Sequence, residues 1–571
     1  MALVHAIKKL PDSRIDVYKE CAGLLLWEWE RLKARQSGRG ESAEDVLAAL
    51  GVPGLRLSEV EDALDKAVFE AHADGDPGIP AQKIRRALQQ EVFINLHGLP
   101  SDRAIGCAEK FIVEWLRGRN GLLVPAEEDS FGVPHRSFRE FMAARFLREH
   151  RLVNPDTGDE ESWTASGPRL AKAGLDQWRE VFRFTAALDS PPEAAQALNE
   201  LCPDQLTYDP IEVQRLFLAA EVARDVGART LSARSKLGKQ VYDRVESQLL
   251  HLMRDTDEAQ PYPNDPPKLT PPAILPPKTR LAAGELLDAL GWPPPDLYDF
   301  LPIYHTEQPN AKRADRNPSN SVNPLFFIAR YPVTNLQYQR FLESDDYDKD
   351  YIWQNVAAFD ADKKTPTRNM GDEAWKWFQE NGGKDRKPYV WDDPRFGASR
   401  RLFPVVGVTW YEAAAYCVWL GRHWSEWPEA SSLQLLTSNV QFRLPTEDEW
   451  KRAAGGEERD RYPWQKTPAK LKGDEIVMVA NTSESDLGGT TPVCMYPAGT
   501  SPATVIDMSG NVWEWQANLY KKGEPYRSLR GGAWYRDAED VTASARFSVH
   551  PDSWSYNVGL RVCAAAPVSR S

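Results

Sequence analysis

Cysteine thiolates are the side chains of this sequence best suited to redox or transition-metal chemistry, and their spacing argues against both. The six cysteines are scattered over the whole chain, and none forms a pair at the spacing of zinc or redox sites. They are Cys21, Cys107, Cys202, Cys417, Cys494 and Cys563. We therefore expect buried thiols without a chemical role.

Other familiar catalytic patterns are missing from the sequence. None of the nine histidines is spaced with a second histidine and an acid on one helical face, as metal sites require, and no residue set suggests a hydrolase triad. The sequence has no Gly-x-x-x-x-Gly-Lys-Ser/Thr run, so it lacks a loop that would hold nucleotide phosphates. The chain is therefore not expected to be an NTPase by itself.

Length and composition indicate several packed domains. The chain has 571 residues, of which 42% are hydrophobic and 27% charged, and this length exceeds what one hydrophobic core serves. Its net charge of −13 repels phosphate backbones, so nucleic acid is not an expected partner. The longest apolar runs are too short to cross a bilayer, and the N-terminus does not resemble a secretory signal. We expect a cytoplasmic protein without a membrane partner.

The N-terminal half has the apolar spacing of helices. A short strand pair is expected at 122–124 and 130–133, and helices around such a hairpin suggest a winged-helix-like unit. The helices predicted before it cover 13–33, 43–50, 58–73, 84–91 and 102–117.

A helix predicted after the hairpin begins with His135-Arg-Ser-Phe-Arg-Glu140. Ser137 and Glu140 suit a capping box, while His135 suits either a surface position or a satisfied core site. The run resembles the His-x-Ser-Phe-x-Glu motif in the lid region of NACHT and related STAND nucleotide-switch proteins, over residues 1–150. The resemblance implies that His135 senses bound nucleotide. Because no phosphate-binding loop is present, it also implies an NTPase region upstream or on another chain.

Residues 151–258 suggest a helical spacer, and a proline-rich stretch follows. The spacer helices are predicted at 177–187, 193–201, 211–226 and 232–253. Clustered prolines deny helix hydrogen bonds and favour extended backbone, so residues 259–318 are expected to form a linker region, with one helix at 279–290.

The remaining chain, 319–568, is expected to be a separate loop-rich domain. Most of the 20 tryptophans lie in it, and such aromatic side chains bury large areas. Three Thr-x-x-Gln/Glu runs predict helices that begin with capping boxes, each worth about 0.5–2 kcal/mol at the N-cap. They begin at Thr334, Thr409 and Thr446.

Six short motifs follow one another in this domain. They are Arg330–Asn335, Pro404–Glu412, Arg443–Trp450, Asp507–Trp515, Leu529–Trp534 and Gly559–Arg561. In order and spacing they resemble the formylglycine-generating (sulfatase-modifying) enzyme family. The resemblance implies an α+β, C-type-lectin-like fold for the C-terminal half, behind an α-helical N-terminal half.

The residues that carry the family's oxidase activity are absent. The resemblance places a serine at Ala533 and two copper-binding cysteines at Arg536 and Val541. Neither arginine nor valine supplies the thiolate that binds cuprous copper, so copper is not expected. The iron-dependent branch needs a His-x-x-x-His-x-Glu run, which the N-terminal half lacks. These departures favour a binding module, and an oxidoreductase that uses non-cysteine residues is the alternative.

Calcium is the ion that the resemblance implies. Its ligands would be the side chains of Asp507 and Glu514 and the carbonyls of Gly510 and Val512, and a second family site begins at Asn481. The alternative is a turn with a solvated acid. We expect calcium to be structural, because the two carboxylates would otherwise face each other without a counter-charge.

The loops that replace the catalytic groove are the expected ligand-binding face. Tyrosine, tryptophan and arginine dominate it, and these residues most often carry binding energy. Its residues are Tyr535, Arg536, Asp537, Phe547, Ser548, His550, Ser553, Trp554 and Tyr556. We expect a protein or small-molecule ligand there, bound by a sensor of a STAND-type signalling or defence protein. Retroelement-diversified variable proteins have related domains, and the same face would then be the variable one.

Overall fold

The computed structural model forms two compact units, Met1–Glu246 and Ser247–Ser571. The residues that the structure describes are 13–28, 43–117, 120–126, 129–205, 208–255, 275–304, 324–367, 369–382, 387–426, 441–456, 461–465 and 473–565. The boundary between the units falls inside helix α14 (Lys236–Arg254). The finer predicted division at residue 150 stays a prediction.

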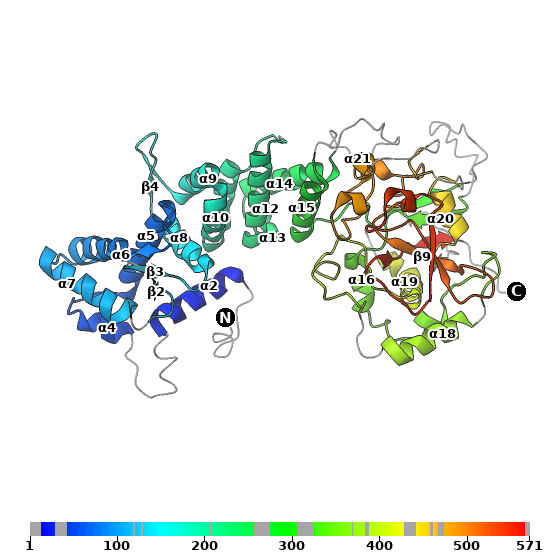
Figure 1. Cartoon of the computed structure of the whole chain (residues 1–571), viewed down its shortest axis with the longest axis horizontal. Coiled ribbons are helices and arrows are strands. Elements are labelled where there is room, and N and C mark those ends of the chain that lie inside the picture. The colour runs from blue at the N-terminus through cyan, green and yellow to red at the C-terminus, as the bar shows by residue number, and fades with distance from the viewer. Residues whose placement is uncertain are drawn as a thin grey trace. The chain divides into compact units, whose positions relative to one another are not determined.

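Helices make up most of the first unit (Figure 1). Its first half contains α2 (Arg14–Gly23), η1 (Leu24–Glu28), α4 (Ala43–Ala49), α5 (Leu57–Ala73), α6 (Ala81–Ala87), η2 (Leu88–Leu96), α7 (Ser101–Phe111), η3 (Ile112–Leu116) and α8 (Arg136–Glu149). Then follow α9 (Trp163–Ala173), α10 (Leu175–Leu188), α11 (Pro191–Leu201), α12 (Pro210–Val226), α13 (Ala228–Arg234) and the start of α14. The helical character predicted from apolar spacing is confirmed, although the single helix predicted at 232–253 is divided at the extended residue Ser235 into α13 and α14.

The predicted hairpin is present as β2 (Val124–Pro125) and β3 (Ser130–Gly132), with Val124 opposite Gly132. A third strand, β1 (Ile79–Pro80), pairs with the other side of β3 and was not predicted. A second hairpin joins β4 (Leu152–Val153) to β5 (Glu160–Glu161). The winged-helix-like comparison stays a prediction.

Two four-stranded sheets organise the second unit. The first sheet has the order β6 (Phe300–Ile303), β7 (Phe326–Ala329), β13 (Cys563–Ala565) and β8 (Gln441–Arg443), all antiparallel. The second has the order β11 (Arg546–Val549), β10 (Arg527–Arg530), β9 (Trp513–Leu519) and β12 (Val558–Gly559), with β12 parallel to β9. Because β13 lies between β7 and β8, the end of the described chain completes a sheet begun far upstream.

The capping boxes predicted at Thr334, Thr409 and Thr446 are confirmed. They begin α16 (Asn335–Leu342), α19 (Trp410–His423) and α20 (Glu447–Ala453). The other helical segments are α17 (Asp350–Gln354), α18 (Met370–Trp377), η5 (Phe378–Gly382), η6 (Trp424–Glu426), α21 (Gly473–Ile476), η8 (Ser483–Ser485), η9 (Pro497–Gly499) and η10 (Ala538–Val541). Most of these helices are short, as expected for a loop-rich domain.

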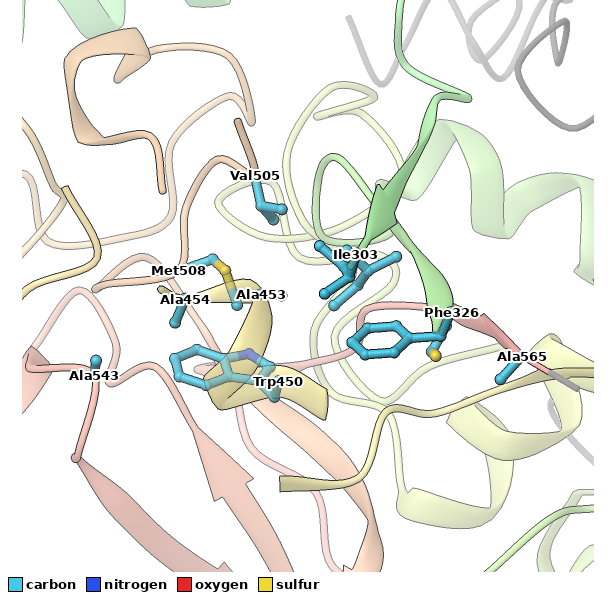
Figure 2. Packing of buried hydrophobic residues seen from close by; sticks show 11 residues of the cluster. Ile303, Phe326, Trp450, Ala453, Ala454, Val505, Met508, Ala543 and Ala565 are labelled. Carbon is cyan, nitrogen blue, oxygen red and sulfur yellow. The ribbon is translucent and has the colours of Figure 1, made fainter. Parts of the chain in front are cut away.

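A hydrophobic core joins α20 to the first sheet (Figure 2). Trp450 of α20 is fully buried and lies with Ile303 of β6 and Phe326 of β7. Cys563 belongs to the same cluster. Its thiol is therefore a core side chain, as the sequence suggested.

Part of the predicted linker region is folded into the second unit. The helix expected at 279–290 is confirmed as α15 (Pro277–Ala289). Arg280 of α15 is buried and donates to the carbonyls of Met253 and Met495. The rest of the proline-rich stretch, apart from 275–304, lies outside the described residues. Among the described helices, none is both long and apolar enough to cross a bilayer.

Candidate functional site

The segment where the resemblance places the family's catalytic cysteines begins with a tight turn at Gly531 and Gly532. Both have positive φ, 98° and 77°. A Cβ on Gly532 would lie 2.4 Å from Cγ1 of Val541, so only glycine permits this approach. Val541 and Ala533 are fully buried, while Arg536 lies half-buried between them in sequence. None of these three side chains offers a thiol.

The cysteines of the chain do not substitute for the missing pair. All six are buried and none forms a disulfide. Burial raises the pKa of the Cys563 thiol well above its usual range, so it is not a thiolate at neutral pH. Within the described residues, no cluster of three or more His, Cys, Asp or Glu side chains is placed to hold a metal ion.

Arg536 is the centre of a group of aromatic side chains. Its Cζ lies 5.0 Å from the ring centre of Tyr535 and 5.9 Å from that of Phe547. Phe547, on β11, also lies 5.9 Å from the ring of Trp513 on β9. Within the described residues, its carboxylate contact is a long one, 3.4 Å from Arg536 Nη1 to Asp540 Oδ2. The guanidinium is thus oriented mainly by aromatic rings.

A second aromatic group contains Trp554 and Tyr556. Trp554 stacks on Tyr389, with ring centres 4.4 Å apart and an interplanar angle of 11°. Tyr556 stacks on Phe396 at 5.8 Å. Trp534 joins the two groups, because its ring lies 5.8 Å from Tyr535 and 6.2 Å from Tyr556. We call the whole set the aromatic surface: Tyr389, Phe396, Trp513, Trp534, Tyr535, Arg536, Phe547, Trp554 and Tyr556.

Much of the aromatic surface is open to solvent. Tyr389, Trp554 and Tyr556 are 60%, 41% and 49% exposed, and Phe547 is 44% exposed. Exposed large rings gathered in one region are a feature that interaction sites commonly have. Tyr389 was missed in the sequence, because its only signal was a Lys-Pro-Tyr-Val run that belongs to no motif.

The other residues predicted for this face have local structural roles. Asp537 caps η10 by accepting from the amide of Asp540. His550 contacts Asp552, and Ser553 donates its amide to the carbonyl of His550 at 3.0 Å. Ser548 is half-buried in β11. These residues border the aromatic surface, and their role in ligand binding stays a prediction.

The predicted calcium turn contains a counter-charge that the sequence reasoning overlooked. Glu514 and Arg561 form an ion pair at 2.7 Å, and both side chains are fully buried. Trp450 Nε1 also donates to Glu514, at 2.7 Å. The expectation that Asp507 and Glu514 lack a counter-charge was therefore wrong, because the arginine of the Gly-Leu-Arg motif reaches Glu514.

Asp507 is the second carboxylate of this turn, and it is also buried. Burial raises the pKa of Asp507 to about 7, and Glu514 adds to the increase. Asn511 donates to Asp507 Oδ2 at 3.2 Å and also binds the backbone of Thr491. The buried hydroxyls of Thr491 and Ser509 have no hydrogen-bond partner within the described part of the chain. The turn thus holds a buried carboxylate beside hydroxyls that are not hydrogen-bonded, and a calcium ion there stays a prediction.

The second predicted calcium position is occupied by internal hydrogen bonds. Asn481 Oδ1 accepts from Ser485 Oγ at 3.0 Å, and Asn481 Nδ2 donates to the carbonyl of Gly489 at 2.9 Å. The nearby acid, Asp486, pairs with Lys278 at 2.8 Å. Asn481 thus holds the loop that packs against Gly510, and a metal there stays a prediction.

His135 is an exposed helix cap. Its Nδ1 accepts from the amide of Ser137 at 3.3 Å, so His135 is the N-cap of α8, which begins at Arg136. The capping box at Ser137 and the core-histidine interpretation were therefore both wrong. Ser137 instead accepts from the hydroxyl of Tyr18 at 2.8 Å, because it lies inside the helix on its buried side. The surface alternative for His135 fits this position, and nucleotide sensing stays a prediction.

Comparison with known proteins agrees with the motif order. The family described as sulfatase-modifying factor enzyme 1-like domain matches residues 304–566. A Mus musculus protein named inactive C-alpha-formylglycine-generating enzyme 2 is 30% identical over 284 residues, which cover 46% of this chain and 82% of the mouse protein. The hercynine oxygenase of Mycobacterium tuberculosis is 28% identical over 277 residues, covering 43% of this chain and 55% of that enzyme.

One solved structure with a similar domain is Treponema denticola variable protein 1. It is 18% identical, with a TM-score of 0.27, and the match covers 47% of this chain and 93% of that one. The family assignment does not depend on it, since it follows from the domain match and the mouse relative. On that evidence, the chain belongs to the sulfatase-modifying factor enzyme 1-like family, through a domain at residues 304–566.

Proposed function

We propose that the C-terminal domain is a non-catalytic module that binds a protein or small-molecule ligand on the aromatic surface. The observation that carries the proposal is the exchange at the catalytic positions. Arg536 stands among exposed aromatic rings where the family's oxidase has a copper-binding cysteine, and Val541 is buried under Gly532. The mouse relative named inactive supports the same conclusion. Aromatic and arginine side chains are those that most often anchor a ligand.

The first test measures whether the protein catalyses the oxidase reaction. Copper-loaded protein is incubated with a cysteine-bearing sulfatase peptide, and mass spectrometry follows conversion of cysteine to the aldehyde. We expect no product, because no thiolate is available to bind cuprous copper. We also expect none from the Arg536→Cys, Val541→Cys double variant, because Val541 is fully buried against the Gly532 turn.

An active formylglycine-generating enzyme serves as the positive control in the same assay. Product from the unmodified chain would contradict the binding-module proposal. It would favour the alternative, an oxidoreductase of this family that acts through non-cysteine residues. We retain this alternative because one relative of the chain is named hercynine oxygenase.

We further propose that calcium stabilises the domain through Asp507. The pKa of Asp507, about 7, lies above the ordinary aspartate value of about 3.9. The folded state therefore binds this proton more tightly, so the contribution of Asp507 to stability is fully present below about pH 4 and is lost as the pH rises through about 7. A cation at Asp507 would remove that decline by balancing the ionised carboxylate.

Calcium should thus raise the melting temperature of the wild-type domain more at pH 8 than at pH 5. Chelation should reverse the gain, and Asp507→Ala should abolish it. Asp507→Asn is the matched variant, because it keeps an oxygen ligand and removes the buried charge. Differential scanning calorimetry measures each transition. An identical curve with calcium and with chelator, in wild type and in Asp507→Ala alike, would remove calcium from the proposal.

For the first unit we propose the lid and helical spacer of a cytoplasmic STAND-type switch protein, with its nucleotide-binding core upstream or on another chain. The exposed position of His135 at the start of α8 is compatible with a nucleotide-sensing contact. Reading the genomic DNA upstream of Met1 for an in-frame phosphate-binding loop tests this. Sequencing the 529–561 segment in closely related strains tests whether the binding face is variable.

A further inference from the structure

The second sheet of the C-terminal domain has an open edge. Among the described strands, β11 pairs only with β10, and it forms one end of the order β11-β10-β9-β12. At the other end, both residues of β12 are buried. Arg546 and Phe547 of β11 are exposed, and Ser548 and Val549 are half-buried. An exposed edge strand offers unpaired amide and carbonyl groups to another chain.

The direction of the edge groups follows from the ladder. The amide of Tyr520 donates to the carbonyl of Tyr526 at 2.8 Å, so the backbone of Tyr526 faces β9. Backbone groups alternate along an antiparallel strand, so those of Arg527 face β11. Arg527 is opposite Val549. Val549 therefore faces β10, and the amide and carbonyl of Ser548 point to the free edge.

Within the described residues, the charged side chain of β11 does not protect the edge. Native edge strands often carry a lysine or arginine that extends over the edge and blocks pairing. Arg546 does not do this, because its guanidinium turns back to bind both carboxylate oxygens of Glu447, at 2.6 and 2.8 Å. The strand is short, so it accommodates only a few added residues.

Two unpaired donors lie beside this edge. Trp513 Nε1 and Arg536 Nε are buried and have no hydrogen-bond partner within the described residues. Trp513 is only 3% exposed. The Phe547 ring lies 5.9 Å from the Trp513 ring and 5.9 Å from Cζ of Arg536. Both groups can only donate, so the complementary ligand presents oxygen acceptors.

We infer that β11 receives an extended peptide of a partner protein as an added strand. The peptide main chain pairs with Ser548. An Asp, Glu, Asn or Gln side chain of the peptide lies beside Phe547 and accepts hydrogen bonds from Trp513 and Arg536. This inference rests on the proposed function and names its ligand class. A peptide strand fits better than a sugar, because donors and acceptors that repeat along the edge match another main chain.

The test begins with a phage-displayed library of linear twelve-residue peptides, selected on the whole chain. An enriched peptide is synthesised with a fluorophore, and its affinity is measured by polarisation. Single N-methyl groups are then placed at each peptide residue. We expect alternate residues to lose about tenfold or more in affinity, because only every second amide pairs with β11. The residues between them should tolerate the methyl group.

The protein is tested at the same edge. Ser548→Pro removes the outward amide, and proline is tolerated where an edge amide faces solvent, so this variant should fold and lose about tenfold in affinity. Lys522→Pro is the control, because the amide of Glu524 donates to the carbonyl of Lys521 and Gly523 has φ 81°, a turn that favours proline at Lys522. If Ser548→Pro does not fold, the pattern of affinity loss among the N-methylated peptides decides whether the peptide adds as a strand.

Two outcomes overturn the inference in distinguishable ways. If N-methylation of alternate residues does not lower the affinity of a selected peptide, the added strand is ruled out. The same holds if the only ligand found is a glycan from a glycan array whose binding depends on Trp554. Both outcomes leave the aromatic surface as a binding site. Failure of both the peptide library and the glycan array to yield any ligand that depends on Arg536 or Trp554 removes the proposed function as well.

Discussion

Replacing Arg561 by methionine should destabilise the C-terminal domain by about 3–5 kcal/mol, because it leaves the buried carboxylate of Glu514 without its cation. Both side chains of the pair are fully buried. Arg561 also donates to the carbonyls of Ala329 and Arg330 at 3.0 and 2.8 Å, and to that of Ile506 at 2.8 Å. Arg561 thus neutralises Glu514, and its hydrogen bonds to Ala329 and Arg330 link the start of the domain to its end.

The companion variant removes both charges. Glu514→Gln with Arg561→Met should be more stable than Arg561→Met alone, because no unpaired charge then stays buried. Lys239→Met, which breaks a surface ion pair with Asp243, should leave the transition unchanged. Urea unfolding followed by tryptophan fluorescence compares the three. If Arg561→Met and Lys239→Met unfold at the same urea concentration, the buried pair does not stabilise the domain.

Sequence reasoning succeeded where a feature depends on neighbours along the chain. The three threonine capping boxes, the α15 helix and the β2–β3 hairpin each need only a few consecutive residues. A cap is a contact between a side chain and an amide three residues later, so its pattern is visible in the sequence.

Features that depend on distant residues were not predictable in this way. Arg561 was known as part of a motif, but its partner Glu514 comes from β9, and only the sheet brings them together. Tyr389 and Trp554 stack although they lie on separate loops. His135 shows that a local pattern can also mislead, because Ser137 suited a cap in the sequence but is buried beside Tyr18.

The edge position of β11 belongs to the same class of non-local features. The sequence Arg546-Phe547-Ser548-Val549 has no property that distinguishes an edge strand from an internal one. Its place follows from pairing with β10 alone among the described strands. Residues predicted for binding on composition, such as Phe547, therefore acquired a specific geometric role only once the strand order was known.

Truncating Arg536 and Trp554 together to alanine should abolish ligand binding while leaving the fold intact. Each anchors one of the two groups that form the aromatic surface, Arg536 beside Tyr535 and Phe547 and Trp554 on Tyr389. Loss of such an anchor costs about 2–4 kcal/mol, and the two values do not add. Each single variant should thus bind at least about tenfold more weakly.

The fluorescent peptide selected on the wild-type chain is the probe, and the melting temperature of each variant checks the fold. Tyr304→Ala is the matched control, because Tyr304 is 40% exposed but directly follows β6 of the other sheet. It should bind as the wild type does. Wild-type affinity in the double variant would place the binding site elsewhere on the domain. Loss in Trp554→Ala alone would assign the ligand to the Tyr389 stack rather than to the arginine that replaces the family's cysteine.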